Sequence, residues 1–267
     1  MVRLVWVDCT RFPLMPDHRL SPRFAPSDTQ PLTPIPLTPI PMTPIPMKTE
    51  LAFILDRSGS MESIRQAAID GFNVFLRDQQ AAPGHNRFSL VFFDSAIETR
   101  LDSIPVAEVV ALDVDTYVPR GSTALLDAIG DTIDRLGKRF AALPPADRPD
   151  HVTLAILTDG EENCSTRYTW QDVAKRIRHQ TESYSWEFLF LGAGEDAIAT
   201  AAKMNIHATN ASAFKADAVG QKAAMASFSR KITSSRQMKS GHATPEQLAD
   251  AQASLEDIVR EEDEKRR

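Results

Sequence analysis

One carboxylate and two hydroxyls follow directly on an apolar run. The segment LAFILDRSGSM, residues 51–61, is apolar up to Leu55 and then presents Asp56, Ser58 and Ser60 at alternate positions. A strand that ends in such a loop supplies the oxygen ligands that a hard cation binds. Asp and Ser are also common turn residues, so this motif alone does not distinguish a cation site from a turn.

Two further groups are expected at the same edge of the sheet. Asp159 follows the apolar run LAIL, and Gly121, Ser122 and Thr123 precede an amphipathic helix that begins LLDAI. Each group has a structural alternative, since Ser122 or Thr123 can cap the helix and Asp159 with Gly160 can form a tight turn. Because the carboxyl ends of parallel strands meet at one edge, the coincidence of these groups with the first motif predicts a single cation site.

The elements that must position these groups alternate between strand and helix patterns from residue 48 on. Apolar runs predict buried strands at residues 51–56, 87–95, 151–160 and 186–194, with alternation typical of an antiparallel edge strand at 96–104. Helical spacing predicts helices at 63–80, 125–140, 170–180, 195–206 and 213–232, with a candidate edge strand at 207–209. The chain is therefore predicted to be α/β, with a doubly wound, mostly parallel sheet, helices on both faces and one antiparallel edge strand.

Taken together, these motifs resemble a known family. DRSGS at 56–60, GST at 121–123 and TDG at 158–160 are similar to the metal-ion-dependent adhesion site of the von Willebrand factor type A domain, of the intracellular bacterial type. The resemblance covers about residues 48–238 and implies a Rossmann-like fold. It also implies that Ser58, Ser60 and Thr123 give hydroxyl ligands, while Asp56 and Asp159 act directly or through water on Mg²⁺, with Mn²⁺ as the alternative ion.

The predicted ligand set favours binding over catalysis. Neutral hydroxyl ligands leave much of the Mg²⁺ charge uncompensated, so an acidic side chain of a protein partner can complete the coordination shell. We therefore expect a metal-dependent protein-binding module and no enzyme. The resemblance makes a separate ATPase chain a candidate partner, since this chain has no G-x-x-x-x-G-K-[ST] phosphate loop. Two alternatives stay open: a metal-assisted phosphatase or hydrolase with Asp56 as nucleophile, and a structural domain with a vestigial site.

Other polar residues near these loops are given supporting roles. Glu161 and Glu162 are expected to form an exposed acidic rim, and Asp127 to accept hydrogen bonds at its helix start or to be paired in the interior. Cys164 is expected to be a structural or loop thiol. The role of Asp94, at the end of VFFD, stays open: it either supports the cation site or caps a turn.

Composition excludes several other classes. The chain has 267 residues and a net charge of -6, without a Lys/Arg stripe, so no nucleic-acid partner is expected. Its two cysteines, Cys9 and Cys164, lie far apart, which argues against a disulfide framework and favours a reducing compartment. The amino-terminal apolar run is too short for a signal peptide and no stretch is long enough to span a bilayer, so we expect a cytoplasmic protein without membrane contact.

The two ends of the chain differ from its middle. Residues 1–47 carry the repeat PLTPI PLTPI PMTPI PM, which predicts an extended polyproline II segment. It is either disordered without a role or a tether or ligand for a proline-recognition domain, and a third alternative is that the native protein starts at Met47. Residues 239–267 end in EDIVREEDEKRR, which predicts a solvated helical or frayed tail.

Overall fold

The fold is built on a single six-stranded sheet. The computed structural model describes residues 47–267, so the predictions for the proline-rich segment lie outside the described residues. The strands follow the order β3-β2-β1-β4-β5-β6, and only the β2–β3 pair is antiparallel. They are β1 (Lys48–Asp56), β2 (His85–Phe93), β3 (Ile97–Pro105), β4 (His151–Thr158), β5 (Glu187–Ala193) and β6 (Ala211–Phe214). The predicted fold class is therefore confirmed.

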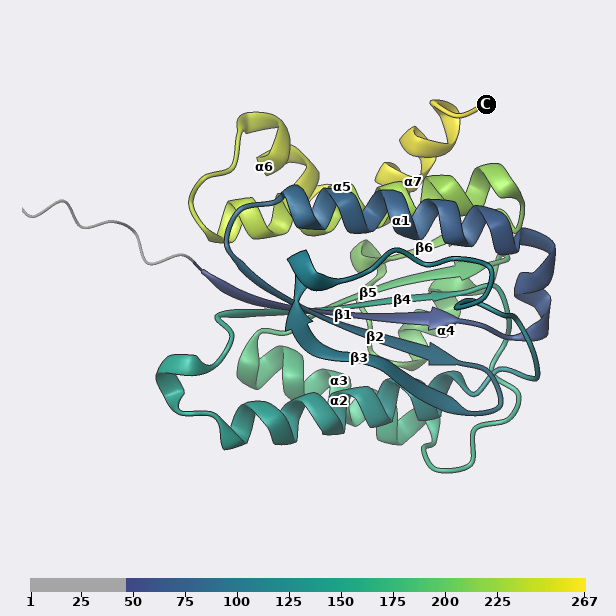
Figure 1. The fold of residues 1–267 in the computed structure, drawn as a ribbon, viewed down its shortest axis with the longest axis horizontal. Coiled ribbons are helices and arrows are strands. Elements are labelled where there is room, and N and C mark those ends of the chain that lie inside the picture. Colours follow the sequence, from purple (N-terminus) through teal and green to yellow (C-terminus); the bar gives the residue numbers. More distant parts are fainter. Residues whose placement is uncertain (1–46) are drawn as a thin grey trace, which may run out of the picture. The chain divides into compact units, whose positions relative to one another are not determined.

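Helices cover both faces of this sheet (Figure 1). On one face lie α1 (Arg65–Ala81) and α5 (Ala218–Lys239), with α6 (Pro245–Gln252) and α7 (Leu255–Glu264) packed against α5. On the other face lie α2 (Leu125–Ala142), α3 (Trp170–Tyr184) and α4 (Ala197–Lys203). Within residues 47–267, no helix has both the length and the apolar character that crossing a membrane requires.

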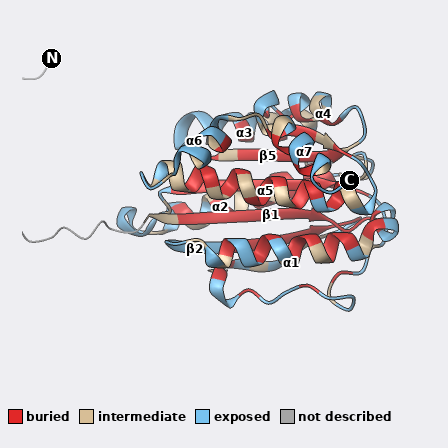
Figure 2. Ribbon diagram, turned by 90° about the horizontal axis from the view of Figure 1, so that it is seen from above, coloured by how far each residue is buried: buried red, intermediate tan, exposed pale blue. Residues whose placement is uncertain are grey.

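The central strand β1 is buried along nearly its whole length (Figure 2). Phe53 and Leu55 enter the core beneath α1 and α5, whereas Ala52 and Ile54 enter the core on the side of α2 and α3. Burial on both faces explains the continuous apolar run in the sequence, because successive side chains of a strand point to opposite faces. This run ends at Asp56, which places a carboxylate at the end of the central strand.

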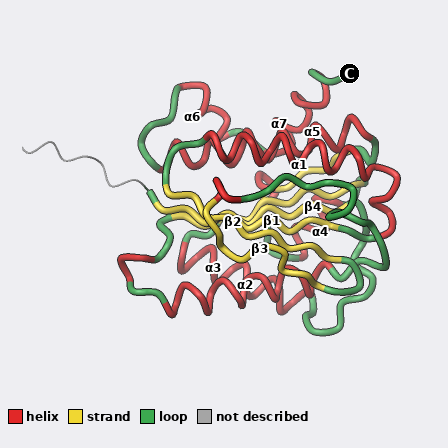
Figure 3. Tube along the Cα trace, in the orientation of Figure 1, coloured by secondary structure: helices red, strands yellow, loops and turns green. Residues whose placement is uncertain are grey.

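The sheet changes direction of winding at this strand. The chain adds β2 and β3 on one side of β1, and β4, β5 and β6 on the other. The loops that leave the carboxyl ends of β1 and β4 gather at one end of the sheet (Figure 3). In doubly wound sheets this position leaves a crevice where ligands bind, and Asp56 and Asp159 stand at its two sides.

The last edge strand lies later in the chain than predicted. Residues Ala208–Asn210 form a 3₁₀ turn, and β6 begins only at Ala211, so the candidate strand at 207–209 is wrong. The side chain of His207 accepts a hydrogen bond from the Thr209 N–H at 3.3 Å, which favours a local turn over strand pairing. The helix predicted from residue 213 begins at Ala218.

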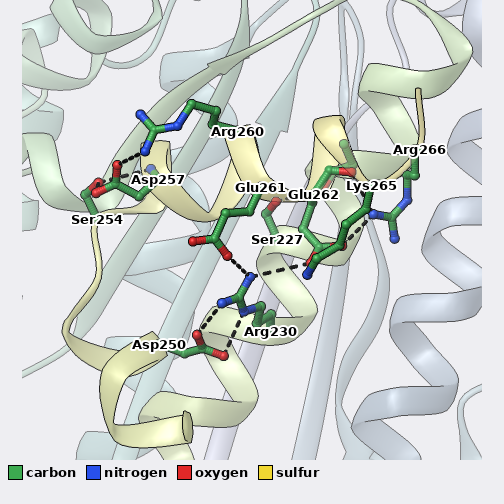
Figure 4. A network of polar contacts seen from close by, with 11 residues as sticks. Ser227, Arg230, Asp250, Ser254, Asp257, Arg260, Glu261, Glu262, Lys265 and Arg266 are labelled. Carbon is green, nitrogen blue, oxygen red and sulfur yellow. Dashed lines mark hydrogen bonds and ion pairs between the residues drawn. The ribbon is translucent and has the colours of Figure 1, made fainter.

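The expectation of a solvated carboxyl-terminal tail is also wrong. Leu255 and Val259 of α7 are buried in the core beneath α1 and α5. Arg230 of α5 joins the two last helices, because its guanidinium contacts Asp250 of α6 at 2.7 Å and Glu261 of α7 at 2.6 Å (Figure 4). The charges that suggested a solvated segment lie on the outer side of a helix whose inner side is apolar.

This packing predicts an asymmetric response to truncation of two leucines. Replacing the fully buried Leu255 by alanine leaves a cavity and is expected to lower the free energy of unfolding by about 2 to 5 kcal/mol. The matched change Leu248→Ala in α6 affects a side chain that is 40% exposed and should lower it by less than about 1 kcal/mol. Urea denaturation measures both, and equal small effects would contradict the packing of α7.

Candidate metal site

The five predicted metal ligands lie together at the carboxyl edge of the sheet. Asp56 ends β1, Ser58 and Ser60 follow in its loop, Thr123 stands just before α2, and Asp159 follows β4. The Ser58 and Ser60 hydroxyl oxygens are 3.0 Å apart. The Ser60 hydroxyl donates to Asp159 Oδ1 at 2.6 Å, which joins two loops that are 99 residues apart in the sequence.

A glycine keeps the space between these groups open. A methyl group on Gly160 would lie 2.9 Å from Thr123 Oγ1, 3.5 Å from Ser60 Oγ and 3.7 Å from Asp56 Oδ2. Oxygens from two separate loops, the one after β1 and the one before α2, therefore converge on a space beside Gly160 that any larger residue would fill. Gly160 is thus a required member of the site, although it offers no ligand of its own.

The donor set fits a hard divalent cation. Two adjacent ligands of an octahedral Mg²⁺ ion, each about 2.0 to 2.1 Å from the metal, lie about 2.9 Å apart, close to the 3.0 Å between the two serine hydroxyls. Within residues 47–267, no group of three or more His, Cys, Asp or Glu side chains could hold a metal. The hydroxyl-rich composition therefore favours Mg²⁺ or Mn²⁺ over a zinc-type site.

Burial changes the acidity of the two carboxylates. Asp56 is fully buried, and its two oxygens accept hydrogen bonds from the Ser58 N–H at 2.7 Å and the Thr158 hydroxyl at 2.5 Å. Burial nevertheless raises the pKa of Asp56 to about 6, because these bonds only partly replace water. Burial also raises the pKa of Asp159. A cation placed between the two groups would favour their ionised forms.

The site is closed on its inner side and open on its outer side. Asp56, Ser58 and Thr123 are buried, while Ser60 is exposed and Asp159 is half-buried. An ion held here would have the carboxylates on its inner side. Its outer side, next to Ser60, would face solvent. The open side is where a water molecule or a ligand from another molecule could reach such an ion.

Backbone hydrogen bonds tie the three ligand loops to one another. The Gly59 N–H donates to the Gly121 carbonyl at 3.1 Å, and the Arg120 N–H donates to the Arg57 carbonyl at 2.8 Å. The Asn163 side chain accepts from the Thr123 N–H at 2.9 Å, and the backbone N–H of Asn163 donates to the Thr123 carbonyl at 3.1 Å. The relative positions of the ligands therefore depend on the loops as a unit.

An ion cluster supports the site from the side of β2. Arg57 contacts Asp94 Oδ2 at 2.8 Å and Glu98 at 2.8 Å, and Arg120 contacts the same oxygen of Asp94 at 3.0 Å. Burial alone would raise the pKa of Asp94, but hydrogen bonds from the Ala96 N–H and both arginines hold it below its usual range. Asp94 thus combines both roles that the sequence left open: it caps a turn and braces the loop of the predicted ligands.

The remaining acids hold the loop after β4 rather than line the site. Glu162 is half-buried and accepts hydrogen bonds from the N–H groups of Leu126, Cys164 and Ser165, so its expected place in an exposed rim is wrong, whereas Glu161 is exposed. Glu162 thereby supplies the acceptor at the start of α2 that Ser122 or Thr123 offered in the sequence.

Asp127 and Cys164 have structural surroundings. Asp127 accepts hydrogen bonds from three consecutive N–H groups of residues 166–168, in the loop before α3, so its partners are not at the start of its own helix as predicted. Burial raises the pKa of the Cys164 thiol, which disfavours the reactive thiolate. The surroundings of Cys164 agree with the structural or loop thiol that the sequence predicted.

Several supporting residues were not predicted from the sequence. Tyr117 is fully buried and donates its hydroxyl to the Asp56 carbonyl at 2.5 Å. Asn163 and Arg120 act through contacts that only the assembled loops create, so neither spacing nor periodicity points to them. Arg57 carried a weak signal, because a charged residue directly after a buried strand needs an acidic partner.

Comparisons with known proteins give a likeness in fold and no match to a known family. No family model matches the chain, and no curated protein does. Among solved structures, the D319A mutant of the PilB minor pilin from Streptococcus sanguinis matches 74% of this chain and 64% of its own, with 10% identity and a TM-score of 0.51. A von Willebrand factor type A structure from Catenulispora acidiphila matches 71% of this chain and 43% of its own, with 18% identity and a TM-score of 0.47.

A third structure also carries the von Willebrand name. The ArnB paralog VWA2 from Sulfolobus acidocaldarius matches 70% of this chain and 45% of its own, with 20% identity and a TM-score of 0.43. The chain thus spans less than half the length of these two von Willebrand structures. With a TM-score of 0.51 and 10% identity, the likeness to the PilB minor pilin extends to the fold alone.

The raised pKa of Asp56 predicts a distinctive pH dependence of stability. Between the ordinary pKa of 3.8 and the raised value of about 6, the folded protein binds more protons at Asp56 than the unfolded chain does. Stability of the metal-free protein therefore falls as the pH rises through this window, by up to about 3 kcal/mol for Asp56 alone.

The variant Asp56→Asn cannot titrate at this position. The difference in free energy of unfolding between wild type and variant, measured by urea denaturation after removal of metal ions, should decline from pH 4 to pH 7 and then level. A difference that stays constant over this range would contradict the raised pKa.

Proposed function

We propose that this chain is a metal-dependent protein-binding module, in which a Mg²⁺ ion captures an acidic side chain of a protein partner. The observation that carries the proposal is the convergence of Thr123, Ser60 and Asp56 on the space above Gly160. Mn²⁺ is an alternative ion, since these ligand types do not separate the two.

The balance of ligand charges supports capture of an acid. Asp56 and Asp159 are the only carboxylates that the proposed ligand set supplies, and the hydrogen bonds to Asp56 from Ser58 and Thr158 already engage both of its oxygens. An ion surrounded largely by neutral hydroxyls keeps a strong attraction for a further carboxylate. The open side beside Ser60 gives a partner side chain access to it.

A metal-assisted phosphatase or hydrolase is the alternative on the same site. Such an enzyme would need Asp56 as a nucleophile within reach of a substrate. Its full burial and its two engaged oxygens favour a role behind the ion instead. Turnover of a phosphate ester that depends on Mg²⁺ and is abolished in Asp56→Asn would overturn the binding proposal.

Metal binding is expected to depend on the space above Gly160. The methyl group of Gly160→Ala would lie 2.9 Å from Thr123 Oγ1, so we expect affinity for Mg²⁺ and Mn²⁺ to fall at least about tenfold, or about 1.4 kcal/mol. Gly137→Ala in helix α2 is the control, since its methyl would lie an ordinary 3.7 Å from the side chain of Gln180 in α3. Titration calorimetry compares the two, and equal affinities would refute the site assignment.

A bound ion should keep a coordination position for a partner's carboxylate. Mn²⁺ bound to the wild type is expected to retain exchangeable water, which enhances the relaxation rate of water protons. Acetate should displace this water and lower the enhancement, whereas acetamide, which has a similar shape and no charge, should not. The experiment compares both probes in the wild type and in Thr123→Ala, in which we expect weaker Mn²⁺ binding.

Two results of this experiment would count against the proposal. Bound Mn²⁺ without exchangeable water would mean that the protein itself fills the coordination shell. Equal effects of acetate and acetamide would mean that the ion does not select a carboxylate. Either outcome leaves the metal site in place and removes its proposed use.

A further inference from the structure

A cavity lies at the amino edge of the sheet, opposite the candidate metal site. It has a volume of about 820 Å³ and is lined by Thr49, Asn86 and His151, at the amino ends of β1, β2 and β4, and by the end of α5. The nine residues of β1 separate it from the candidate metal site by about 25 Å, given the rise of a strand. The cavity is therefore distinct from the site of the proposed function.

Arg236 of α5 brings a buried positive charge to this cavity. The residue lines the cavity and is only 5% exposed. Its Nη1 donates to Gln79 Oε1 of α1 at 2.7 Å, but its Nη2 is buried without a hydrogen-bond partner. A bond to a neutral amide holds the side chain in place and leaves its charge unbalanced.

None of the nearby acids pairs with Arg236. Glu187 accepts a hydrogen bond from Ser235, its Oε2 atom lies 3.2 Å from His151 Nε2, and its charge acts on Lys239. Asp150 accepts from the Lys48 N–H at 2.8 Å. Among residues 47–267, no acid forms an ion pair with Arg236. Burial alone accounts for the lowering of its pKa to about 10, with no nearby carboxylate opposing the shift.

A second cation stands one helical turn away on the same face of α5. Lys239 also lines the cavity, and its Nζ lies 2.8 Å from the Nδ1 atom of His151. A lysine ammonium has three donors, so at least one remains beyond its contacts with the two His151 ring nitrogens. His242 and Ser240, in the turn after α5, complete this side of the cavity with further polar groups.

We propose that this cavity binds a small oxyanion, carried by a phosphate or a carboxylate group, through Arg236 and Lys239. The anion supplies the negative charge that Arg236 lacks and accepts a hydrogen bond from the free donor of Lys239. A small rotation of the guanidinium brings the buried Nη2 of Arg236 to the cavity as a second donor. The planar guanidinium suits a ligand with two or more acceptor oxygens, which phosphates and carboxylates share. The cavity is large enough to accommodate an organic group attached to the anion.

The test measures anion binding on the full chain, after removal of metal ions on a resin so that no soluble chelator competes. Inorganic phosphate and malonate are titrated separately at constant ionic strength against sodium chloride, by calorimetry and by the shift in melting temperature. Binding of phosphate alone, of malonate alone or of both supports the site and identifies which carrier of the anion it accepts.

Variants of α5 distinguish this cavity from a general attraction of anions. Arg236→Gln and Lys239→Gln should each weaken anion binding at least tenfold. Lys222→Gln removes the same charge from the half-exposed opposite end of α5 and should leave binding unchanged. If Arg236→Gln does not fold, as judged by circular dichroism, Lys239→Gln decides the matter.

Two outcomes would overturn the proposal. The first is that neither phosphate nor malonate binds the wild-type chain more tightly than chloride does. The second is that folded Arg236→Gln and Lys239→Gln bind the anions as tightly as wild type and Lys222→Gln do. Because metal is absent throughout, neither outcome bears on the proposed metal-dependent function.

Discussion

The burial of one carboxylate at the end of the central strand is the constraint on which the candidate site depends. Asp56 has no contact with solvent, and an ionised group in such a place is unstable unless other groups replace its water. Ser58 and Thr158 supply one hydrogen bond to each oxygen. The loops after β1 and β4 must therefore approach closely, and this approach also brings Ser60 and Asp159 together.

The same constraint explains why so many supporting contacts are made by backbone groups. The loop containing Ser58 and Ser60 is held to residues 120 and 121 by main-chain hydrogen bonds, and the loop after β4 is held to Thr123 through Asn163. Backbone contacts fix position without using side chains that the ion would need. Arg57 and Asp94 then pair beneath the loop, so that a buried arginine and a buried aspartate offset each other. The ligands are placed by the sheet and its loops, and only their final orientation depends on an ion.

Sequence reasoning succeeded where the signal was local and failed where it depended on assembly. The strands could be predicted because burial on both faces leaves continuous apolar runs, and the ligand positions followed because those runs end at one edge. The position of β6 could not, because the turn at His207 is decided by a side-chain hydrogen bond. The packing of α7 was hidden by its charges, which exceed its few buried apolar residues in number. The role of Glu162 depends on the start of α2, which the sequence places 36 residues away from it.

The two edges of the sheet present the same electrostatic problem with opposite sign. At the carboxyl edge, burial raises the pKa of Asp56 and Asp159, and a cation would relieve this strain on both groups. At the amino edge, burial lowers the pKa of Arg236, and an anion would relieve it. The edges are about 25 Å apart along β1, beyond the screening length of about 8 Å at physiological salt. Direct attraction between a cation at one edge and an anion at the other is therefore weak. Each ligand would stabilise the fold by its own binding free energy, and a larger combined effect would have to come through movement of the elements that join the two edges.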